Sequence, residues 1–475
     1  MTTRPLRLLA LTSTLALGAA GCAAAAPPAA DAQPASASAA VAAPEVASVP
    51  APPPPPAASA AAAAPAEIAA PSAPRAKGFG RMGGARASAA DAPAKAEAAV
   101  AEPAQQQGVR AGEWDDNANY REFQRWIASS RSLGAHAVDV SSRQFIVVRD
   151  ADGKAVPRCG VLVKDRTEHA VALTTTASGR ALLFPRAEGL VGDELTATPQ
   201  CAGAAVPVRF SAAHADGIVD LKLATRRSAP RREVELGFVL DTTGSMAEEI
   251  SAVKATIQKV AATLGADGAT VKVGLVEYKD RSDEFVTRVY PMTSDLAKFS
   301  RDVDHLSAGG GGDYPESVNE GLHVALSGLD WGGSSAVKMA VLVGDAPPHL
   351  DYPGDYDYAR DMKDASHRGI QVLTVAASGM DALGQMVWRQ IAQYTDSTNL
   401  FLLRGAAGPQ SMGAGDPLSS CGGAQTSFRS GNLDALVVER VRRELKNVDR
   451  DPMRIPGVGQ DENAKPCGKR VQVAG

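Results

Sequence analysis

The stretch FVLDTTGSM, residues 238–246, is an apolar run that ends in one aspartate and continues at once into hydroxyl side chains and a glycine. Residues 233–240, EVELGFVL, form a short run of mostly apolar residues bounded by polar ones, which predicts a buried strand. A polar loop after such a strand suits two chemistries, metal coordination by oxygen atoms or phosphoryl transfer to Asp241. The rest of the sequence is needed to distinguish metal coordination from phosphoryl transfer.

Strand-like and helix-like segments alternate from residue 232 to residue 404. The amphipathic helix expected at 246–265 is followed by a strand at 271–280, and the alternation then continues to the strand NLFLL at 399–403. Such alternation predicts an α/β fold with a doubly wound, mostly parallel sheet covered by helices on both faces. Ligands of such folds bind beyond the carboxyl ends of the strands.

Three polar loops follow predicted elements of this domain and are expected to meet at that edge of the sheet. They are the loop after residue 240, the loop AGGGGDYPES at 308–317 and the loop after the strand that ends VLVGDAPPH at 341–349. Their hydroxyls and carboxylates form an all-oxygen set, which suits Mg²⁺ first and Mn²⁺ or Ca²⁺ as alternatives. The predicted metal ligands are Asp241, Thr243, Ser245, Asp313 and Asp345.

These motifs together resemble von Willebrand factor type A domains, and DTTGSM, GGGGDYPE, GDAPPH and YTDSTNLFLL are most similar to the bacterial and hemicentin-like branch. The family's metal-ion-dependent adhesion site has the pattern D-x-[ST]-x-S after the first strand, matched by Asp241, Thr243 and Ser245. Asp345 matches its aspartate after the fourth strand. The resemblance implies that the two hydroxyls bind the ion directly, that the aspartates reach it through water, and that the domain binds a partner.

Asp313 departs from the integrin-like pattern, which has a threonine on the second loop. A third carboxylate lowers the net charge of the site, so the ion should depend less on an acidic residue from a partner. An alternative reading is that Asp313 caps a helix that starts near Pro315 and never touches metal.

Phosphoryl transfer is disfavoured by what the motif lacks. DTTGS is close to the D-K-T-G-T of P-type ATPases, but the lysine and the full G-D-G-x-N-D are absent, and no segment after residue 21 is long and apolar enough to span a membrane. Haloacid-dehalogenase phosphatases need a second aspartate where Thr243 stands. An exported protein also lacks an ATP supply. We therefore predict a binding protein and not an enzyme.

Residues 1–21 have the features of an export signal. Arg4 and Arg7 precede the apolar run LLALTSTLALGAA, and AAGC at 19–22 resembles the lipobox of bacterial lipoproteins, although Ala19 replaces the usual leucine. The resemblance implies lipid on Cys22 and, with Ala23 following it, an outer-membrane location on either face. An ordinary signal peptide with an incidental cysteine is the alternative.

Residues 22–107 are mostly alanine and proline, as in APPPPPAASAAAAAPAEIAAP at 51–71. This composition cannot bury enough apolar surface to offset its ordering entropy, so it predicts a disordered tether between lipid and folded domains. The basic patch RAKGFGRMGGAR at 75–86 could touch anionic lipid or glycan, or could serve only as a solubilising cluster.

Two smaller units and a tail complete the organisation. Residues 113–133 are expected to form a short helical segment, and strand-like runs over 137–225 predict a small all-β sandwich. The stretch FIVVRDADGKAVP at 145–157, with the later TTTASGRALLFP, resembles carboxypeptidase-regulatory, immunoglobulin-like domains. Residues 405–475 are expected to be a loop, a helix over 433–448 and a disulfide-tied tail.

The four cysteines beyond Cys22 are an even number in an exported chain, which predicts disulfides. Sequence proximity favours Cys159 with Cys201 and Cys421 with Cys467. Each pair would close a loop worth about 4 kcal/mol before strain. Zinc is the competing reading, but no CxxC or CxxH spacing supports it.

The predicted partner is a protein or a surface glycan, bound in adhesion or in assembly of an envelope complex. A net charge of −4 gives no electrostatic case for nucleic acid, and the membrane is reached only through the lipid anchor. The alternatives are a regulatory or chaperone-like subunit of an envelope enzyme or secretion system, and a structural domain that binds no metal. The candidate partner surface near the metal edge consists of Tyr314, Glu316, His349, Tyr352 and Tyr356.

Overall fold

The computed structural model describes residues 109–201, 206–333, 335–377, 379–403 and 429–455. The predicted signal peptide, Cys22, the tether at 22–107 and the predicted Cys421–Cys467 pair lie outside the described residues. Within those residues, none of the helices combines the length and apolar character needed to cross a bilayer.

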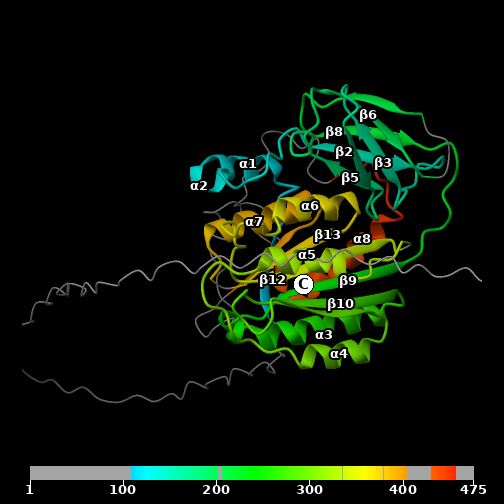
Figure 1. Cartoon of the computed structure of the whole chain (residues 1–475). Coiled ribbons are helices and arrows are strands. Elements are labelled where there is room, and N and C mark those ends of the chain that lie inside the picture. Colours follow the sequence, from blue (N-terminus) through cyan, green and yellow to red (C-terminus); the bar gives the residue numbers. More distant parts are fainter. Residues whose placement is uncertain (1–108, 202–205, 334, 378, 404–428, 456–475) are drawn as a thin grey trace, which may run out of the picture. The chain divides into compact units, whose positions relative to one another are not determined.

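A large mixed sheet forms the centre of the α/β domain (Figure 1). Its eight strands lie in the order β11-β10-β9-β12-β13-β14-β1-β15, and the five central strands from β10 to β14 run parallel. The fold class predicted from the sequence is therefore confirmed. The strands are β1 Arg110–Trp114, β9 Glu233–Asp241, β10 Thr270–Tyr278, β11 Thr287–Thr293, β12 Val337–Gly344, β13 Gln371–Ala376, β14 Asn399–Leu402 and β15 Arg429–Asn432.

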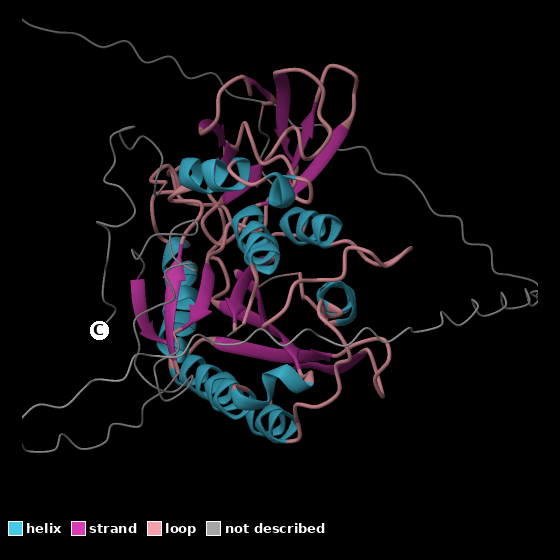
Figure 2. Cartoon of the chain, turned by 90° about the vertical axis from the view of Figure 1, so that its left-hand side faces the viewer, coloured by secondary structure: helices cyan, strands magenta, loops and turns pink. Residues whose placement is uncertain are grey.

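Helices cover both faces of this sheet, as Figure 2 shows. Successive side chains of the central strands enter opposite cores: Phe238 and Leu240 of β9 pack with one set of helices and Val239 with the other. This explains why β9 is buried along almost its whole length and why its residues 236–240 are apolar or glycine without alternation. The first set is α3 Ile250–Ala266, α4 Leu296–Asp304 and α8 Leu433–Asn447; the second includes α5 Val318–Gly328, α6 Tyr358–His367 and α7 Ala382–Tyr394.

The segment before the sandwich contributes a strand to the large sheet. Residues 113–133 were expected to be helical, and α1 Tyr120–Ala128 and α2 Arg131–Gly134 do form there, but β1 precedes them and pairs antiparallel with β14 and with β15. Ala111 and Trp114 of β1 are buried. The α/β domain is thus built from chain on both sides of the sandwich in sequence.

The sandwich consists of a three-stranded sheet, β5-β2-β8, and a four-stranded sheet, β4-β3-β6-β7. Side chains of both sheets share one apolar core. The predicted disulfide between Cys159 and Cys201 is present, with the two Cα atoms 5.1 Å apart. The strands are β2 Gln144–Arg149, β3 Gly160–Lys164, β4 Ala170–Thr174, β5 Arg180–Leu183, β6 Glu194–Pro199, β7 Val208–Ser211 and β8 Gly217–Lys222.

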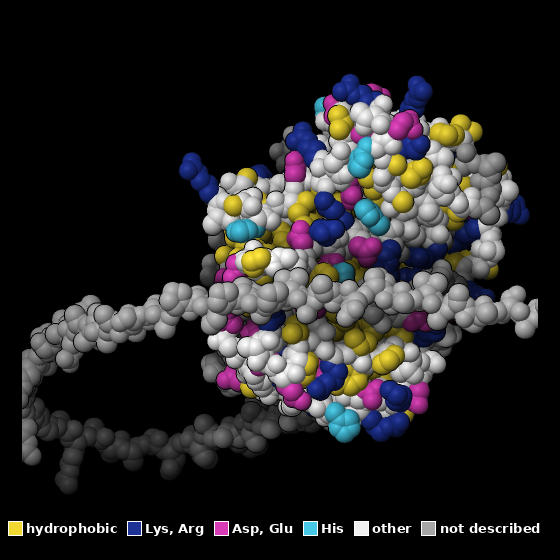
Figure 3. Space-filling view, viewed as in Figure 1, with side chains coloured by type: hydrophobic (Ala, Val, Ile, Leu, Met, Phe, Trp, Pro, Cys, Tyr) yellow, Lys and Arg dark blue, Asp and Glu magenta, His cyan; other side chains and the backbone are white. Residues whose placement is uncertain are grey.

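The sandwich contacts the helices of the α/β domain through the loop after β5. The ring of Phe184 lies 4.7 Å from the ring of Tyr394 in α7. The Tyr394 hydroxyl donates a hydrogen bond to Glu188, whose carboxylate lies 3.0 Å from Nε2 of His367 in α6. Charged side chains of both signs are spread over the face drawn in Figure 3.

Candidate metal centre

The polar side chains of the candidate site come from the carboxyl ends of three adjacent parallel strands. Asp241 is the last residue of β9, Asp345 follows β12 directly, and Asp280 lies two residues beyond the end of β10. Because these strands are neighbours in the sheet, their carboxylates meet at one edge. Asp280 was not among the predicted ligands, although its place after a predicted strand was a usable signal.

Four of the five predicted metal ligands lie in a row, each within 3.1 Å of the next. Oδ1 of Asp241 accepts from the backbone N–H of Thr243 at 2.9 Å and from its hydroxyl at 2.7 Å. The hydroxyls of Thr243 and Ser245 lie 3.1 Å apart, and that of Ser245 donates to Oδ1 of Asp345 at 3.1 Å. We call these four residues, Asp241, Thr243, Ser245 and Asp345, the oxygen cluster.

The oxygen cluster holds buried negative charge with no basic partner. Asp241 is 0% exposed, and its Oδ2 atom has no hydrogen-bond partner. Burial raises the pKa of Asp241 to about 7, with the nearby Asp345 carboxylate adding to the rise and the Thr243 hydroxyl opposing it. Burial also raises the pKa of Asp345. Among the described residues, no Lys, Arg or His forms an ion pair with either carboxylate.

Glu316 lies beside the oxygen cluster in the interior. Its side chain is buried, Oε2 has no hydrogen-bond partner, and burial together with Asp241 and Asp280 raises its pKa to about 9. Glu316 and His349 were predicted to face a partner, but they are only 3% and 2% exposed, which corrects that prediction. They are buried because their loops run side by side: the Glu316 N–H donates to the Pro347 carbonyl, and the His349 N–H donates to the Glu316 carbonyl.

The glycine run before Asp313 lets the second loop pack against the first. The Gly244 N–H donates to the Gly310 carbonyl at 2.9 Å, and the Gly309 N–H donates to the Thr242 carbonyl at 3.0 Å. Gly310 has a φ of +78°, and a Cβ there would lie 2.2 Å from a carboxylate oxygen of Asp283. A side chain at Gly310 would therefore collide with Asp283, whose Oδ2 accepts hydrogen bonds from the backbone N–H groups of Asp280 and Gly311.

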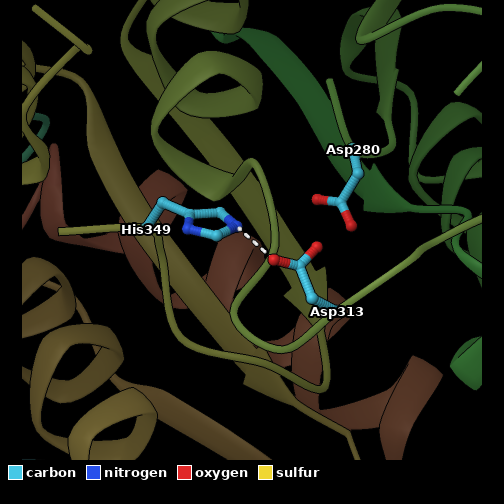
Figure 4. Close-up of side chains that lie close together, drawn as sticks. All are labelled: Asp280, Asp313 and His349. Atoms are coloured by element: carbon cyan, nitrogen blue, oxygen red, sulfur yellow. Dashed lines mark ion pairs between the residues drawn. The ribbon is translucent and has the colours of Figure 1, made fainter. Parts of the chain in front are cut away.

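Asp313, the fifth predicted ligand, does not join these hydrogen bonds. Its side chain is 60% exposed, and Oδ2 lies 3.9 Å from Nε2 of His349 (Figure 4). The alternative reading, a cap on the following helix, does not fit either, because α5 begins at Val318 with Ser317 at its N-cap position. Asp313 instead faces His349 and Asp280.

The three predicted partner-surface tyrosines differ in exposure. Tyr314 is 49% and Tyr356 is 42% exposed, while Tyr352 is half-buried. The ring of Tyr352 stacks on His349 at 3.7 Å between centroids, and that of Tyr356 stacks on His323 at the same distance. The tyrosines thus reach the surface while their neighbouring histidines anchor the loop between β12 and α6.

Comparison with known families identifies the core of the α/β domain. Residues 235–335 match the model of the von Willebrand factor A domain. The matched range contains β9, β10 and the glycine-rich loop, and therefore includes Asp241, Thr243, Ser245 and Asp313, while Asp345 lies ten residues beyond it. Residues 235–335 are thus similar to von Willebrand factor A domains, as the motifs in the sequence indicated.

Two curated proteins are similar to about a quarter of this chain. The ariadne-like RING finger protein R811 of Acanthamoeba polyphaga mimivirus is 28% identical over 132 residues, which are 27% of this chain and 12% of that protein. The alpha-protein kinase vwkA of Dictyostelium discoideum is 30% identical over 135 residues, 27% of this chain and 21% of that protein. The chain therefore spans only a small part of either relative.

Solved structures were also found to be similar. The conserved hypothetical protein BatB from Bacteroides thetaiotaomicron has a TM-score of 0.30 at 14% identity, over 45% of this chain and 98% of that one. The pilus adhesin SpaC from Lactobacillus rhamnosus GG has a TM-score of 0.32 at 14% identity, over 47% of this chain and 31% of that one.

Proposed function

We propose that this chain binds a divalent cation at the oxygen cluster and uses the occupied site to bind a partner. The observation that carries the proposal is Asp241, a fully buried carboxylate with an unpartnered oxygen and no ion pair to a basic side chain in the part of the chain that the structure describes. Burying an uncompensated carboxylate is costly, and a cation removes that cost. The match to a von Willebrand factor A domain supports this reading, because such domains commonly bind a divalent cation at the equivalent loops.

The donors of the oxygen cluster fit a hard cation. The Thr243 hydroxyl donates its proton to Asp241, and the Ser245 hydroxyl donates to Asp345, so lone pairs of both hydroxyl oxygens remain available to an ion. Two hydroxyls and two carboxylates, completed by water, suit Mg²⁺ first and Mn²⁺ or Ca²⁺ next. Asp313 is not needed for this set.

The partner we propose is a protein or surface glycan of the cell envelope, bound in adhesion or in assembly of an envelope complex. The exposed Tyr314 and Tyr356 support a contact surface near the oxygen cluster, since tyrosines are enriched where proteins bind one another. We further propose that the protein is an exported outer-membrane lipoprotein, anchored through Cys22 by its Ala/Pro tether, and that it is not an enzyme.

Capture of partners from envelope extracts of the source cell tests this function. The full chain is immobilised and washed in Mg²⁺ or in EDTA, alongside Ser245→Ala and the control Ser251→Ala, which changes an exposed serine of α3. We expect a partner that is retained in Mg²⁺ by the native chain and by Ser251→Ala, and lost in EDTA or with Ser245→Ala. Equal retention in Mg²⁺ and EDTA would contradict the proposal. Recovery of an envelope enzyme would point to a regulatory subunit.

A further inference from the structure

A second group of potential ligand atoms lies next to the oxygen cluster but outside its hydrogen bonds. Asp280, Asp313 and His349 each offer one ligand atom, and these atoms all lie within 4.8 Å of one another. Figure 4 shows the three side chains converging from the loop after β10, the glycine-rich loop and the loop after β12. We call them the nitrogen cluster, because one of the three ligand atoms is an imidazole nitrogen.

Two of the three side chains are buried, and each has an atom without a close hydrogen-bond partner. Asp280 is 1% exposed, and its Oδ1 accepts no hydrogen bond. His349 is 2% exposed, and its Nε2 lacks a hydrogen-bond partner. Unpaired buried polar atoms are rare in folded proteins, because each one carries a desolvation cost. Both side chains point toward Asp313, the exposed member of the nitrogen cluster, and Nε2 of His349 is the nitrogen nearest to it.

The surroundings of His349 hold its ring in the orientation that a metal ligand needs. Nδ1 lies 2.9 Å from Oδ1 of Asp351, and donation of the Nδ1 proton to that carboxylate leaves the Nε2 lone pair facing the nitrogen cluster. The ring stacks on Tyr352 with an interplanar angle of 11°. The backbone is fixed as well, since Asn319 donates to the His349 carbonyl at 2.8 Å.

We propose that the nitrogen cluster is a second cation site, which binds a transition ion such as Zn²⁺ or Co²⁺ through Nε2 of His349 and the carboxylates of Asp280 and Asp313. Imidazole favours these ions over Mg²⁺ and Ca²⁺. The proposal goes beyond the proposed function, because it concerns a different ligand set and a different class of ion.

The geometry needs only a small adjustment. Two ligand atoms that each lie about 2.1 Å from one ion are at most about 4.2 Å apart. In a tetrahedral site the two atoms lie about 3.4 Å apart. The ligand atoms are now at most 4.8 Å apart, so the side chains must close by up to about 1.4 Å, with the exposed Asp313 moving toward the buried Asp280 and His349. Three protein ligands leave at least one position open, so the ion could also bind water or a group from the partner.

A protonated His349 is the competing reading of the nitrogen cluster. In that case both ring nitrogens donate, Nε2 pairs with Asp313 across 3.9 Å, and no metal is needed. His323 offers a matched control, because its Nδ1 lies 3.0 Å from Asp361 and its ring stacks on Tyr356, yet no such group of ligand atoms surrounds it in the part of the chain that the structure describes.

Zinc binding in the presence of Mg²⁺ tests the proposal. The full chain is stripped with EDTA, dialysed into millimolar Mg²⁺ with increasing Zn²⁺, and its bound zinc is measured by mass spectrometry of the metal. We expect zinc affinity to fall by at least about tenfold in His349→Gln and in Asp280→Asn, and to stay within about twofold of native in His323→Gln. Co²⁺ in place of Zn²⁺ adds an absorption spectrum that reports nitrogen ligation.

Two further variants show whether a loss of zinc affinity comes from the nitrogen cluster or from another cause. Asp351→Asn leaves all three ligands in place and changes an exposed residue, so the chain should fold. We expect its zinc affinity to be about tenfold weaker than that of the native chain, because the Asp351 carboxylate no longer orients the ring of His349. Ser245→Ala alters only the oxygen cluster, and a zinc loss in it equal to that of His349→Gln would place the zinc there and overturn the proposal. Absence of bound zinc, or equal binding by His349→Gln and native chain, would also overturn it, whereas the proposed function depends on Mg²⁺ alone.

Discussion

Two buried aspartates of the α/β domain show opposite ways of carrying charge in an interior. Asp116 is 2% exposed and receives two hydrogen bonds from the guanidinium of Arg389, at 2.8 and 2.6 Å, and one from Nε1 of Trp114 at 2.6 Å. Asp241 is equally buried, but its Oδ1 accepts hydrogen bonds from the backbone and hydroxyl of Thr243, its Oδ2 has no close hydrogen-bond donor, and no basic side chain of the described residues pairs with it. Arg389 neutralises the negative charge of Asp116 within the fold. The negative charge of Asp241 has no such partner among the described residues, and we propose that a bound cation neutralises it.

The pKa of each group follows from these surroundings. Burial raises the pKa of both carboxyl groups, but at Asp116 the Arg389 guanidinium opposes that rise. At Asp241 the neighbouring charge is Asp345, which raises the pKa further. A buried carboxylate paired with arginine therefore has a structural role, and one paired with another carboxylate indicates a cation site.

The largest expected effect comes from breaking the structural pair. Arg389→Met leaves Asp116 buried without its counter-charge, so we expect the free energy of unfolding to fall by about 3–5 kcal/mol in urea titrations. The loss should be the same in EDTA and in Mg²⁺, because this pair does not touch the oxygen cluster. The exposed Arg301→Met is the control and should change stability by less than about 0.5 kcal/mol. A loss of unfolding free energy that depends on Mg²⁺ would contradict the distinction between Asp116 and Asp241, because the Asp116–Arg389 pair would then be linked to the cation site.

The corresponding change at Asp241 should have the opposite sign. In EDTA at pH 7, Asp241→Asn removes a carboxyl that the native state holds partly protonated, so we expect the free energy of unfolding to rise by about 2–4 kcal/mol. Asp116→Asn should lower it, since Arg389 then lacks its counter-charge. Urea unfolding of both variants measures the difference. Destabilisation of the metal-free chain by Asp241→Asn would mean that the carboxylate is satisfied without an ion.

The pH dependence of the unfolding free energy also tests whether Asp241 lacks a counter-charge in the metal-free native state. The pKa of Asp241 is about 7 in the native state against 3.8 ordinarily, so the native state binds a proton that the unfolded chain releases. This contribution is fully present below pH 3.8 and is lost as the pH rises through 7. Between pH 6 and pH 8 in EDTA, native chain should lose about 1.4 kcal/mol more than Asp241→Asn. Parallel pH profiles for the two proteins would argue against a perturbed Asp241.

The smallest expected effect is at Glu316. Its pKa of about 9 means that it is protonated at pH 7, so Glu316→Gln preserves the charge of the folded site. We expect the dissociation constant for Mg²⁺, measured by calorimetry at pH 7, to change by less than about threefold, or about 0.7 kcal/mol. A tenfold weakening would show instead that Glu316 carries a negative charge that the ion needs.

Local patterns predicted most of the fold and all four residues of the oxygen cluster. The apolar strand before Asp241 and the hydroxyls after it are specified within nine residues, and the carboxyl-edge rule placed Asp345 beside them. The strand β1 was missed because its five residues, RAGEW, have no clear apolar pattern and its partner β14 is far along the chain. Its strand character depends on tertiary pairing.

The errors at the candidate site have a similar cause. Glu316 and His349 were assigned to the surface because polar loops are usually exposed, but a bridge between Glu316 and Pro348 joins their two loops and buries both side chains. Asp280 was overlooked because no motif contains it, although it ends the predicted strand 271–280; only the structure shows that it lies near Asp313 and His349. Contacts between loops cannot be deduced from either loop alone.

Thermal unfolding of the full chain in EDTA and in Mg²⁺ at pH 7.5 tests the central claim most directly, with Ser245→Ala and Ser251→Ala alongside. A cation at about 100 times its dissociation constant should add about 2.7 kcal/mol to the native chain and to Ser251→Ala, and much less to Ser245→Ala. If Mg²⁺, Mn²⁺ and Ca²⁺ all leave the unfolding of the native chain unchanged, the oxygen cluster is not a cation site and the account of Asp241 is wrong.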